Sequence, residues 1–511
     1  MNIKTAVIKT TCALLSTIML SSAACGLSAS AKTDSFTITN PYANIDWDSV
    51  NQYKTALHSH TNASDGKITL RQSLERHYET GFDIVSVTDH GVVDYSWREK
   101  KSPDFMYKTL HLVGRNIEGL DYLGDSGSFE KGMGYTMLSR SGDEYLVTDD
   151  GREIMQIPCG IEQNAISVNA HVNSWFADFH RNLPNDYQDA VRGVEKEGGL
   201  CVINHPGEYS NARYELYQKD AYNLENASYK YLFQKFYGII DKYDSCLGID
   251  INSKGDDRTR YDRKLWDLML TKAAESGKTV LAVATSDAHQ LDKIDTGSTY
   301  ILASEKTSEA VKSALKNGEF FPSSTCICNY EELCQIAESI KEYYGETELY
   351  AELCDIITAY DAERSELEKT GKRSNVWERY KAIDDDGYFN RSARPMIKSI
   401  TVDDSKNTIS VKSSDALLVR WISDGKLIAT TTANNGTSDL DDYADEIGGY
   451  IRAEVFGEGG IVYTQSFTLN AEQKTPQKNH FLNLGFMDFL IPDLNNYLSL
   501  IIRAVKGLFT K

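Results

Sequence analysis

The stretch FDIVSVTDH, residues 82–90, decides the fold class of this chain. It starts as an apolar run rich in β-branched residues, which is typical of a buried strand, and it ends on Asp89-His90, two residue types that bind metal ions. Just before it, apolar residues recur at four-residue spacing over residues 70–78 and stop at Gly81, which indicates an amphipathic helix ended by glycine. A helix followed by a buried strand is the repeating unit of an α/β domain.

Further apolar runs of the same kind follow along the chain, and the last is preceded by a helical pattern around residues 265–274. Strands that alternate with helices over roughly 250 residues indicate an α/β domain with a mainly parallel sheet, open or closed into a barrel. The additional expected strands are Ile154–Ile157, Leu200–Ile203, Leu247–Ile251 and Thr279–Ala284.

Five of the apolar runs lead into residues that bind metals. Active sites of α/β folds form at the carboxyl ends of the strands, so side chains that are distant in sequence converge there. We therefore expect these strand ends to assemble one site. The runs are Ala56-Leu57 before His58, Ile84–Val87 before Asp89-His90, Ile157 before Glu162, Val202-Ile203 before His205, and Val283-Ala284 before Asp287 and His289.

A pair of histidines opens this series, within LHSHTNASDG (residues 57–66). On an extended segment His58 and His60 point to the same face, and imidazole is a common ligand of zinc, manganese and iron. The spacing by itself is equally compatible with two solvated surface histidines. The rest of the chain has to distinguish the two interpretations.

Nine residues form the candidate metal site, and they include six of the ten histidines of the chain. Taken singly, a histidine or carboxylate near a strand end is more often a hydrogen-bonded structural residue than a ligand. The set as a whole favours a metal site over that interpretation. Its members are His58, His60, Asp65, His90, Glu162, His171, His205, Asp287 and His289.

Several of these residues occur in short motifs with a characteristic order. The motifs are His58-Ser59-His60 followed by Ser64-Asp65-Gly66, then Thr88-Asp89-His90, Asn204-His205-Pro206, and Ser286-Asp287-Ala288-His289. Over roughly Ala56 to Leu302 the chain resembles the PHP (polymerase and histidinol phosphatase) metallohydrolases. It is most similar to the carbaryl-hydrolase-like branch, partly through Ala170-His171-Val172-Asn173. The resemblance implies an α/β fold, a distorted (β/α)7 barrel that holds two or three divalent metal ions.

The resemblance also implies roles for the nine residues. His58 and His60 would bind one metal, with Glu162 bridging to a second. Completing or bridging the neighbouring positions would fall to Asp65, His90 and Asp287, and binding the remaining metals to His171, His205 and His289. Mixed histidine and carboxylate ligation suits zinc, manganese or iron. We expect the catalytic work to fall to His58, His60, Asp65, His205 and Asp287.

The glutamate ligand has a competitor. Residues 157–162 resemble the apolar-Pro-Gly-x-Glu strand end of the family, with Cys159 as an additional residue. Glu144, in Gly142-Asp143-Glu144, remains an alternative to Glu162.

The function implied by the resemblance is that of a metal-dependent phosphoesterase. It would hydrolyse small phosphate mono- or diesters through a metal-bound hydroxide at a di- or trinuclear site. Arg115, Lys254 and Arg258 are candidates to contact the phosphate oxygens, each with the alternative of being a solvated surface charge. Because the same hydroxide could attack carbon, carboxyl or carbamate ester hydrolysis is an alternative. A non-catalytic surface binding protein is another.

The charge balance restricts the partners. The 511 residues carry a formal net charge of −20, with 41% hydrophobic and 25% charged residues. Binding many phosphates requires clustered lysine and arginine, so a chain this acidic is not a general nucleic-acid coat. We expect a small-molecule phosphoester substrate and no stable nucleic-acid complex.

The N-terminus predicts export. Residues 1–31 combine Lys4 and Lys9 with an apolar run around Ala13–Leu20 and small residues before Lys32, which is typical of a cleaved signal peptide. Lipid attachment at Cys25 is an alternative. The protein would be secreted or associated with the cell surface.

Composition divides the rest of the chain. The barrel is expected over residues 42–330, with residues 101–151 as a lid or specificity insert. A helical insert (331–393) and a small β-sandwich-like domain (394–470) follow. The tail, residues 471–511, is amphipathic, and we interpret it as a helix that packs on the protein or makes peripheral contact with a membrane.

Overall fold

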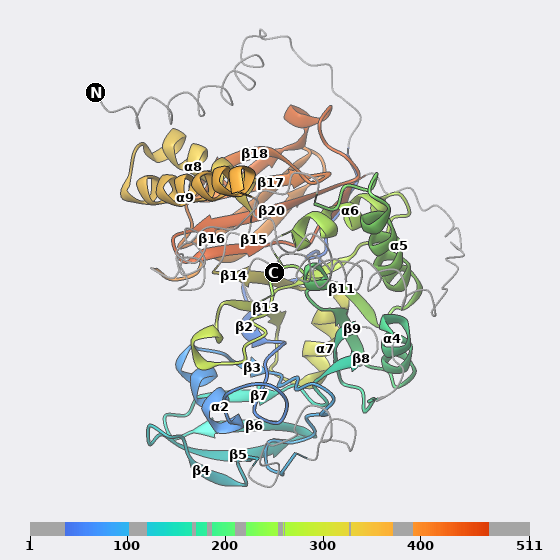
Figure 1. The fold of residues 1–511 in the computed structure, drawn as a ribbon, viewed down its shortest axis with the longest axis vertical. Helices are drawn as coiled ribbons and strands as arrows, with labels where there is room; N and C mark the ends of the chain where they lie inside the picture. The colour runs from blue at the N-terminus through green and yellow to red at the C-terminus, as the bar shows by residue number, and fades with distance from the viewer. Residues whose placement is uncertain are drawn as a thin grey trace, which may run out of the picture. The chain divides into compact units, whose positions relative to one another are not determined.

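The computed structural model describes residues 36–101, 120–165, 170–180, 186–209, 221–253, 259, 261–325, 329–370 and 392–469 (Figure 1). The predicted signal peptide and the predicted C-terminal tail lie outside these residues, as do Arg115, Lys254 and Arg258. Within the described part of the chain, no helix combines the length and the apolar character that crossing a membrane requires.

Three strands near the N-terminus pair in parallel. They are β2 (Asn51–Ala56), β3 (Ile84–Val85) and β7 (Glu153–Gln156). Helix α2 (Leu70–Glu79) connects β2 to β3, as its apolar spacing predicts. It begins with a capping box between Thr69 and Gln72, in which each side chain accepts from the other residue's backbone N–H.

A second sheet contains five strands in the order β12-β11-β10-β9-β8. Its strands β10 (Leu200–Ile203), β11 (Cys246–Asp250) and β12 (Leu281–Val283) pair in parallel. Helices α5 (Ala227–Lys242) and α6 (Asp262–Ala274) connect them. Strands β8 (Ile161–Ala165) and β9 (Ala170–Trp175) precede them, and α4 (Tyr187–Lys196) leads from β9 to β10.

Two isolated parallel bridges join the sheets. Ser59 pairs with Ala288, beyond the ends of β2 and β12, and His90 pairs with Glu162, beyond the end of β3. With these bridges, the pairing runs from β2 to β3, on to β8, through the second sheet to β12, and returns to β2. The bridges lie at the ends of strands from which the candidate ligands come.

One part of this arrangement departs from the expected mainly parallel (β/α)7 order. Strand β9 is antiparallel to both β8 and β10. The reason is the connection between β8 and β9, residues 166–169, because a parallel crossover needs a dozen or more residues. The parallel, helix-connected pattern therefore holds for β2–β3 and β10–β12 and is interrupted at β8–β9.

The segment predicted as a lid or specificity insert forms strands where it is described. Strands β4 (Ser126–Ser128), β5 (Gly134–Arg140) and β6 (Asp143–Thr148) are antiparallel, and β6 pairs with β7. They extend the first sheet at its end, as Figure 1 shows. Residues 102–119 of this segment lie outside the described residues.

Strands of the segment that was predicted as a small β-sandwich-like domain continue the first sheet. Strand β13 (Gly297–Ala303) pairs with β2 and with β14 (Phe320–Ser324), and β14 pairs with β21 (Gly460–Tyr463). The residues of β21 are all buried, so pairing with β21 covers the edge of β14. The remaining strands of this sheet are β1 (Ile38–Thr39), β17 (Leu418–Ser423), β18 (Lys426–Thr432), β20 (Tyr450–Gly457) and β22 (Phe467–Leu469).

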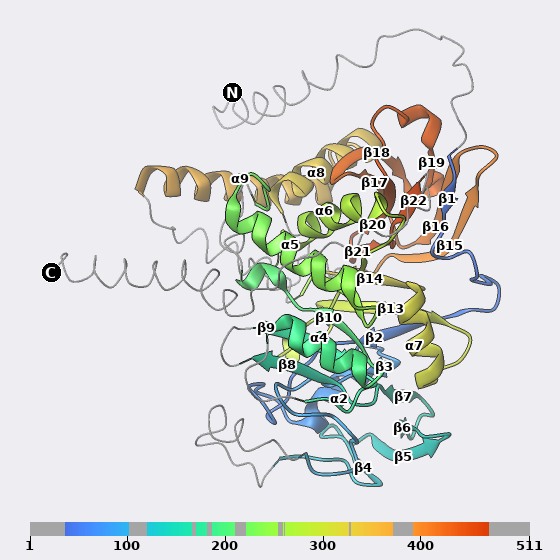
Figure 2. The ribbon, with the colours of Figure 1, turned by 90° about the vertical axis from the view of Figure 1, so that its right-hand side faces the viewer.

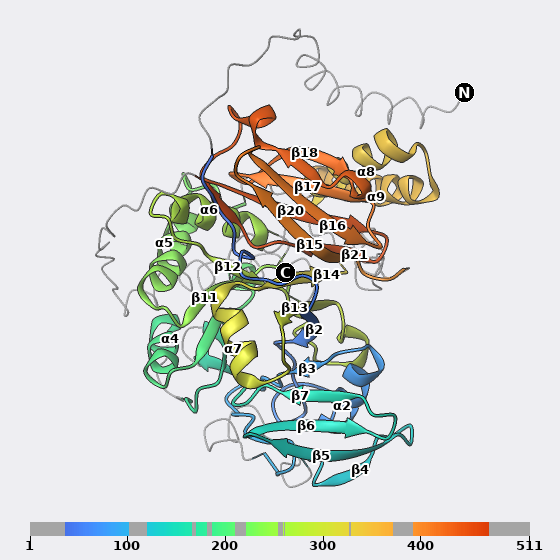
Figure 3. The same ribbon diagram turned by 180° about the vertical axis from the view of Figure 1, so that it is seen from behind.

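Helices α8 (Tyr330–Tyr344) and α9 (Glu348–Thr370) occupy the described part of the predicted helical insert. They lie beside β17 and β18 in Figures 1 and 2, and their apolar residues cluster with Leu418 and Phe456. A three-stranded sheet of β15 (Met396–Asp403), β16 (Thr408–Ser414) and β19 (Thr437–Asp439) lies on the other side, as Figure 3 shows. The remaining elements are α7 (Ser308–Asn317) and the short 3₁₀ helices η2 (Pro206–Tyr209), η4 (Leu291–Lys293), η5 (Ala433–Asn435) and η6 (Leu440–Tyr443).

An apolar core underlies the strand ends. Alternate strand residues such as Ile84, Met155, Val202 and Val283 cluster together and are almost fully buried. This packing holds the strands in fixed positions relative to one another. Polar side chains that follow these residues therefore meet at a defined place.

Candidate metal centre

The structure brings all nine predicted residues together. Each belongs to at least one group of three or four side chains whose ligand atoms lie within 4.8 Å of one another. They come from separate segments: His58, His60 and Asp65 follow β2, His90 follows β3, Glu162 lies in β8, His171 in β9, His205 follows β10, and Asp287 and His289 follow β12.

The innermost group contains both histidines of the HSH segment. His58 Nε2 and His60 Nε2 lie 3.0 Å apart. Asp287 Oδ1 is 3.3 Å from His58 Nε2 and 3.1 Å from His60 Nε2. Because the three side chains are at most 1% exposed, the two-surface-histidine interpretation is wrong.

Glu162 lies between this group and three further histidines. Its Oε2 atom is 3.3 Å from His58 Nε2 and 3.0 Å from His90 Nδ1. Its Oε1 atom is 2.9 Å from His171 Nδ1 and 3.3 Å from His205 Nε2. A carboxylate with each oxygen facing different imidazoles can bridge two cations.

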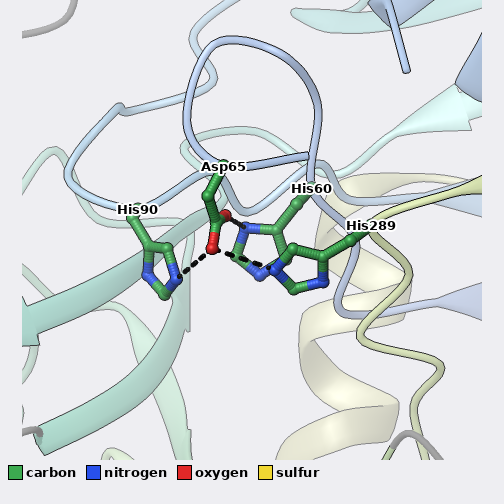
Figure 4. Close-up of side chains that lie close together, drawn as sticks. All are labelled: His60, Asp65, His90 and His289. Atoms are coloured by element: carbon green, nitrogen blue, oxygen red, sulfur yellow. Dashed lines mark ion pairs between the residues drawn. The ribbon is translucent and has the colours of Figure 1, made fainter. Parts of the chain in front are cut away.

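The outer group is the accessible one, and Figure 4 shows its three histidines, His60, His90 and His289, around Asp65. Asp65 Oδ2 lies 3.2 Å from His289 Nε2 and 3.7 Å from His90 Nε2, and Asp65 Oδ1 lies 3.5 Å from His60 Nδ1. The side chains of Asp65 and His289 are 44% and 29% exposed. Solvent therefore reaches the centre from this side.

The spacing of the donor atoms fits divalent metal ions. Ligand atoms about 2.1 Å from one ion lie roughly 3.0–3.5 Å from each other, depending on the coordination geometry. The nitrogen and oxygen atoms of the inner groups are 2.9 to 3.3 Å apart. Six imidazoles and three carboxylates also form a donor set suited to zinc, manganese or iron.

A hydrogen bond orients one of the imidazoles for such ligation. His289 Nδ1 lies 2.8 Å from the carbonyl oxygen of Asp287. This partner is an acceptor, so in the neutral imidazole Nδ1 carries the proton and Nε2, the atom that faces Asp65, keeps its lone pair. His205 presents Nε2 to Glu162, and its Nδ1 lies 3.2 Å from Glu208 Oε2.

Burial and neighbouring charges set the protonation of the centre. Burial lowers the pKa of His58 and of His90, which favours the neutral imidazole. Burial alone would raise the pKa of Glu162, but the surrounding histidines hold it well below its usual range. Burial opposes the charging of His60, yet Asp287 and Glu162 outweigh it and raise its pKa. The pocket thus favours a positive charge, which a metal ion would supply in place of protons.

Two of the candidate ligands have a strained backbone. His205 has a φ of 25° and Asp287 a φ of 45°, in the left-handed region that favours glycine. Such conformations cost about 1–3 kcal/mol and tend to occur at functional sites. Here they turn the chain directly after β10 and β12 so that both side chains face the centre.

The structure separates the two candidate glutamates. Glu162 lies in the centre. Glu144 accepts a hydrogen bond from Ser96 Oγ at 2.8 Å and pairs with Arg98 Nε at 3.3 Å, within the β5–β6 segment. Glu144 belongs to none of the candidate metal groups among the described residues.

Several supporting residues were not among the predicted site residues. Asn204 Nδ2 donates to Glu162 Oε1 at 2.8 Å, and Glu208 contacts His205. Asp89 is buried and accepts hydrogen bonds from the loop that carries His60. Asn204 and Asp89 each directly precede a predicted ligand in the sequence, and this position could have identified them as supporting residues. Lys101, which pairs with Asp89, has no such signal.

No family model matches the sequence, and no curated protein matches it. Remote similarities to solved structures exist. A two-domain protein from Bacteroides vulgatus, described as containing a predicted PHP-like metal-dependent phosphoesterase, shares 14% sequence identity at a TM-score of 0.33, over 86% of this chain and 91% of its own. PsfC from Pseudomonas syringae shares 12% identity at a TM-score of 0.28, over 52% of this chain and 87% of its own.

A lesion-specific endonuclease from Pyrococcus furiosus shares 13% identity at a TM-score of 0.28, over 52% of this chain and 56% of its own. None of these descriptions refers to the carbaryl-hydrolase-like branch, which stays a prediction. Because these sequence identities and TM-scores are low, the functional argument rests on the geometry of the centre.

Proposed function

We propose that this protein is a metal-dependent phosphoesterase that hydrolyses small phosphate mono- or diesters. The observation that carries the proposal is the convergence of nine histidine and carboxylate side chains, from separate chain segments, into overlapping groups of donor atoms. A histidine with a purely structural role rarely needs several histidine and carboxylate neighbours, since one or two hydrogen bonds satisfy its ring nitrogens.

The overlapping groups suggest where two or three ions would be held. His58, His60, Asp287 and Glu162 would hold the innermost ion, and Glu162 would bridge to His171 and His205. Asp65, His90 and His289 of the outer group would hold a third. When bound, such ions lower the pKa of coordinated water to about 7 and stabilise charge on the attacking and leaving oxygens.

The exposure of the centre supports a small substrate. Asp65 and His289 are accessible, whereas the side chains of His58, His60 and Glu162 are at most 1% exposed. A phosphate group entering from the accessible side would meet the outer group first. The net charge of −20 disfavours a polyanionic substrate such as long nucleic acid.

Hydrolysis assays test the proposal directly. Nitrophenyl phosphate, bis-nitrophenyl phosphate and nitrophenyl acetate would be compared with added manganese or zinc and after chelation. We expect metal-dependent turnover of one or both phosphates. Turnover of the acetate alone would instead favour the carboxyl ester alternative.

A matched pair of variants tests the residues. His58→Ala combined with His60→Ala should abolish turnover, whereas His77→Gln, which changes a buried histidine in α2, should retain it. Unchanged turnover in the double variant would refute the site. Metal analysis of the purified protein covers the remaining alternative, because less than one ion per chain would favour a non-catalytic binding protein.

We also propose that the chain is exported, with residues 1–31 as its signal peptide. The support is the charged start, the apolar run and the small residues before Lys32. Mass spectrometry of the mature N-terminus would test it: a start at Lys32 supports cleavage, and a lipid-modified Cys25 supports the lipoprotein alternative. Binding of residues 471–511 to anionic vesicles would test the proposed membrane contact.

A further inference from the structure

A buried chain of hydrogen bonds runs from Lys101 to His60 behind the HSH segment. Lys101 Nζ lies 2.8 Å from Asp89 Oδ2 and 3.1 Å from Asp94 Oδ1, and the lysine side chain is 4% exposed. Ser64 Oγ donates to Asp89 Oδ1 at 2.7 Å and lies 3.3 Å from His60 Nδ1. Asp89, Ser64 and His60 are fully buried.

The donors around Asp89 determine the direction of these bonds. Besides Lys101, the backbone N–H and the hydroxyl of Thr61 both donate to Asp89, each at 2.7 Å. A carboxylate surrounded by an ammonium group and N–H and O–H donors acts only as an acceptor. The hydroxyl of Ser64 has one proton, and its other carboxylate contact, to Asp65 Oδ1, is longer at 3.4 Å. That proton therefore points to Asp89.

The direction of the Ser64 bond in turn determines the tautomer of His60. Since the Ser64 proton points to Asp89, its oxygen can only accept from His60, and Nδ1 of His60 must carry the proton. In the neutral imidazole, the form that binds a metal ion, His60 Nε2 then keeps its lone pair. It is Nε2 that lies 3.0 Å from His58 Nε2, 3.2 Å from Glu162 Oε2 and 3.1 Å from Asp287 Oδ1.

We propose that Lys101, Asp89 and Ser64 form a relay that positions His60 as a metal ligand by holding it in the Nδ1–H tautomer. The opposite tautomer would direct an N–H into the centre, where it cannot bind a metal ion. Lys101 is thus a positioning residue, which acts on the centre through two buried side chains. The inference rests on the proposed metal-dependent function and deepens it, because it assigns roles to three residues that are not ligands themselves.

Zinc binding by the full chain tests the relay without relying on activity. Ser64→Ala removes the last link, and Lys101→Met removes the cation while keeping a similar length. Loss of a supporting partner of this kind weakens metal affinity by about 10–100-fold. We expect that loss in both variants, measured by competition with a chromophoric chelator.

The matched control is Lys235→Met. Lys235 is another buried lysine, 5% exposed, in α5, where its Nζ lies 5.1 Å from the centre of the Tyr187 ring. This variant should retain the zinc affinity of the wild type. If Lys101→Met fails to fold, Ser64→Ala carries the test, since it deletes a single oxygen atom.

A spectroscopic signature separates positioning from a merely structural role. In zinc-loaded protein labelled with ¹⁵N-histidine, the His60 signal, identified by its absence from His60→Gln, should report a proton on Nδ1. Ser64→Ala should shift that signal, whereas a structural role would lower only the melting temperature. Equal zinc affinity in Ser64→Ala and wild type would overturn the relay. A wild type with less than one zinc per chain would overturn the proposed function instead.

Discussion

Substituting Gly160 with alanine should disturb both the fold and the metal centre. A Cβ atom at this position would lie 2.2 Å from Ser86 Oγ and 2.6 Å from the Val87 carbonyl oxygen. Real Cβ contacts essentially never fall below 3.0 Å. Rotation of the serine side chain can relieve the first contact. The second can be relieved only by a movement of the backbone, which must increase the distance from the Cβ atom to the Val87 carbonyl oxygen from 2.6 Å to at least 3.0 Å.

The expected cost follows from where this movement occurs. Overpacking of a tightly packed site typically costs about 1–3 kcal/mol in the free energy of unfolding. Gly160 precedes Glu162 by two residues, and Glu162 is bridged to His90 and lies 3.0 Å from its Nδ1. A shift of several tenths of an ångström here separates candidate ligands of one ion. We therefore expect zinc affinity to fall by about tenfold as well.

A double-variant cycle provides the assay. Unfolding by urea would be followed for Gly160→Ala, Ser86→Ala and the combination. Ser86 Oγ makes no hydrogen bond within the described residues, so Ser86→Ala alone should cost little. The combination should recover only part of the loss, because the Val87 carbonyl remains. A Gly160→Ala protein with wild-type unfolding free energy and zinc affinity would refute the reasoning.

Three further predictions concern stability. Burial lowers the pKa of His77 to about 4, so as the pH falls below about 6.5 this histidine is protonated in the unfolded chain before it is protonated in the folded one. The free energy of unfolding should therefore decrease by up to about 3 kcal/mol by pH 4. His77→Gln should remove this contribution, which urea unfolding of the variant and the wild type at pH 7 and pH 5 would measure. Arg452 lies 2.7 Å from both Asp267 and Glu454 in the interior, so Arg452→Met should cost about 3–5 kcal/mol in urea unfolding, while Lys406→Met at the surface should leave the midpoint unchanged. Chelation should lower the melting temperature, because an ion present at 1,000 times its dissociation constant adds about 4 kcal/mol of stability; identical melting curves with and without chelator would contradict bound metal.

The sequence by itself predicted the α/β class, several strands and the residues that gather at their ends. This was possible because the relevant signals are local. An apolar run of four to six residues indicates a buried strand, and the polar residue that follows it must lie at the strand's carboxyl end. His58, His205 and Asp287 could be singled out in this way although more than two hundred positions separate the first from the last.

Only the tertiary structure decided which residues contact one another across the chain. It placed Glu162 rather than Glu144 in the centre, made β9 antiparallel and joined the C-terminal strands to the first sheet through β14 and β21. It also brought Lys101 to Asp89. A lysine has the same local pattern whether it is solvated or buried beside a carboxylate, so its partner depends on packing between distant segments, which sequence periodicity does not encode.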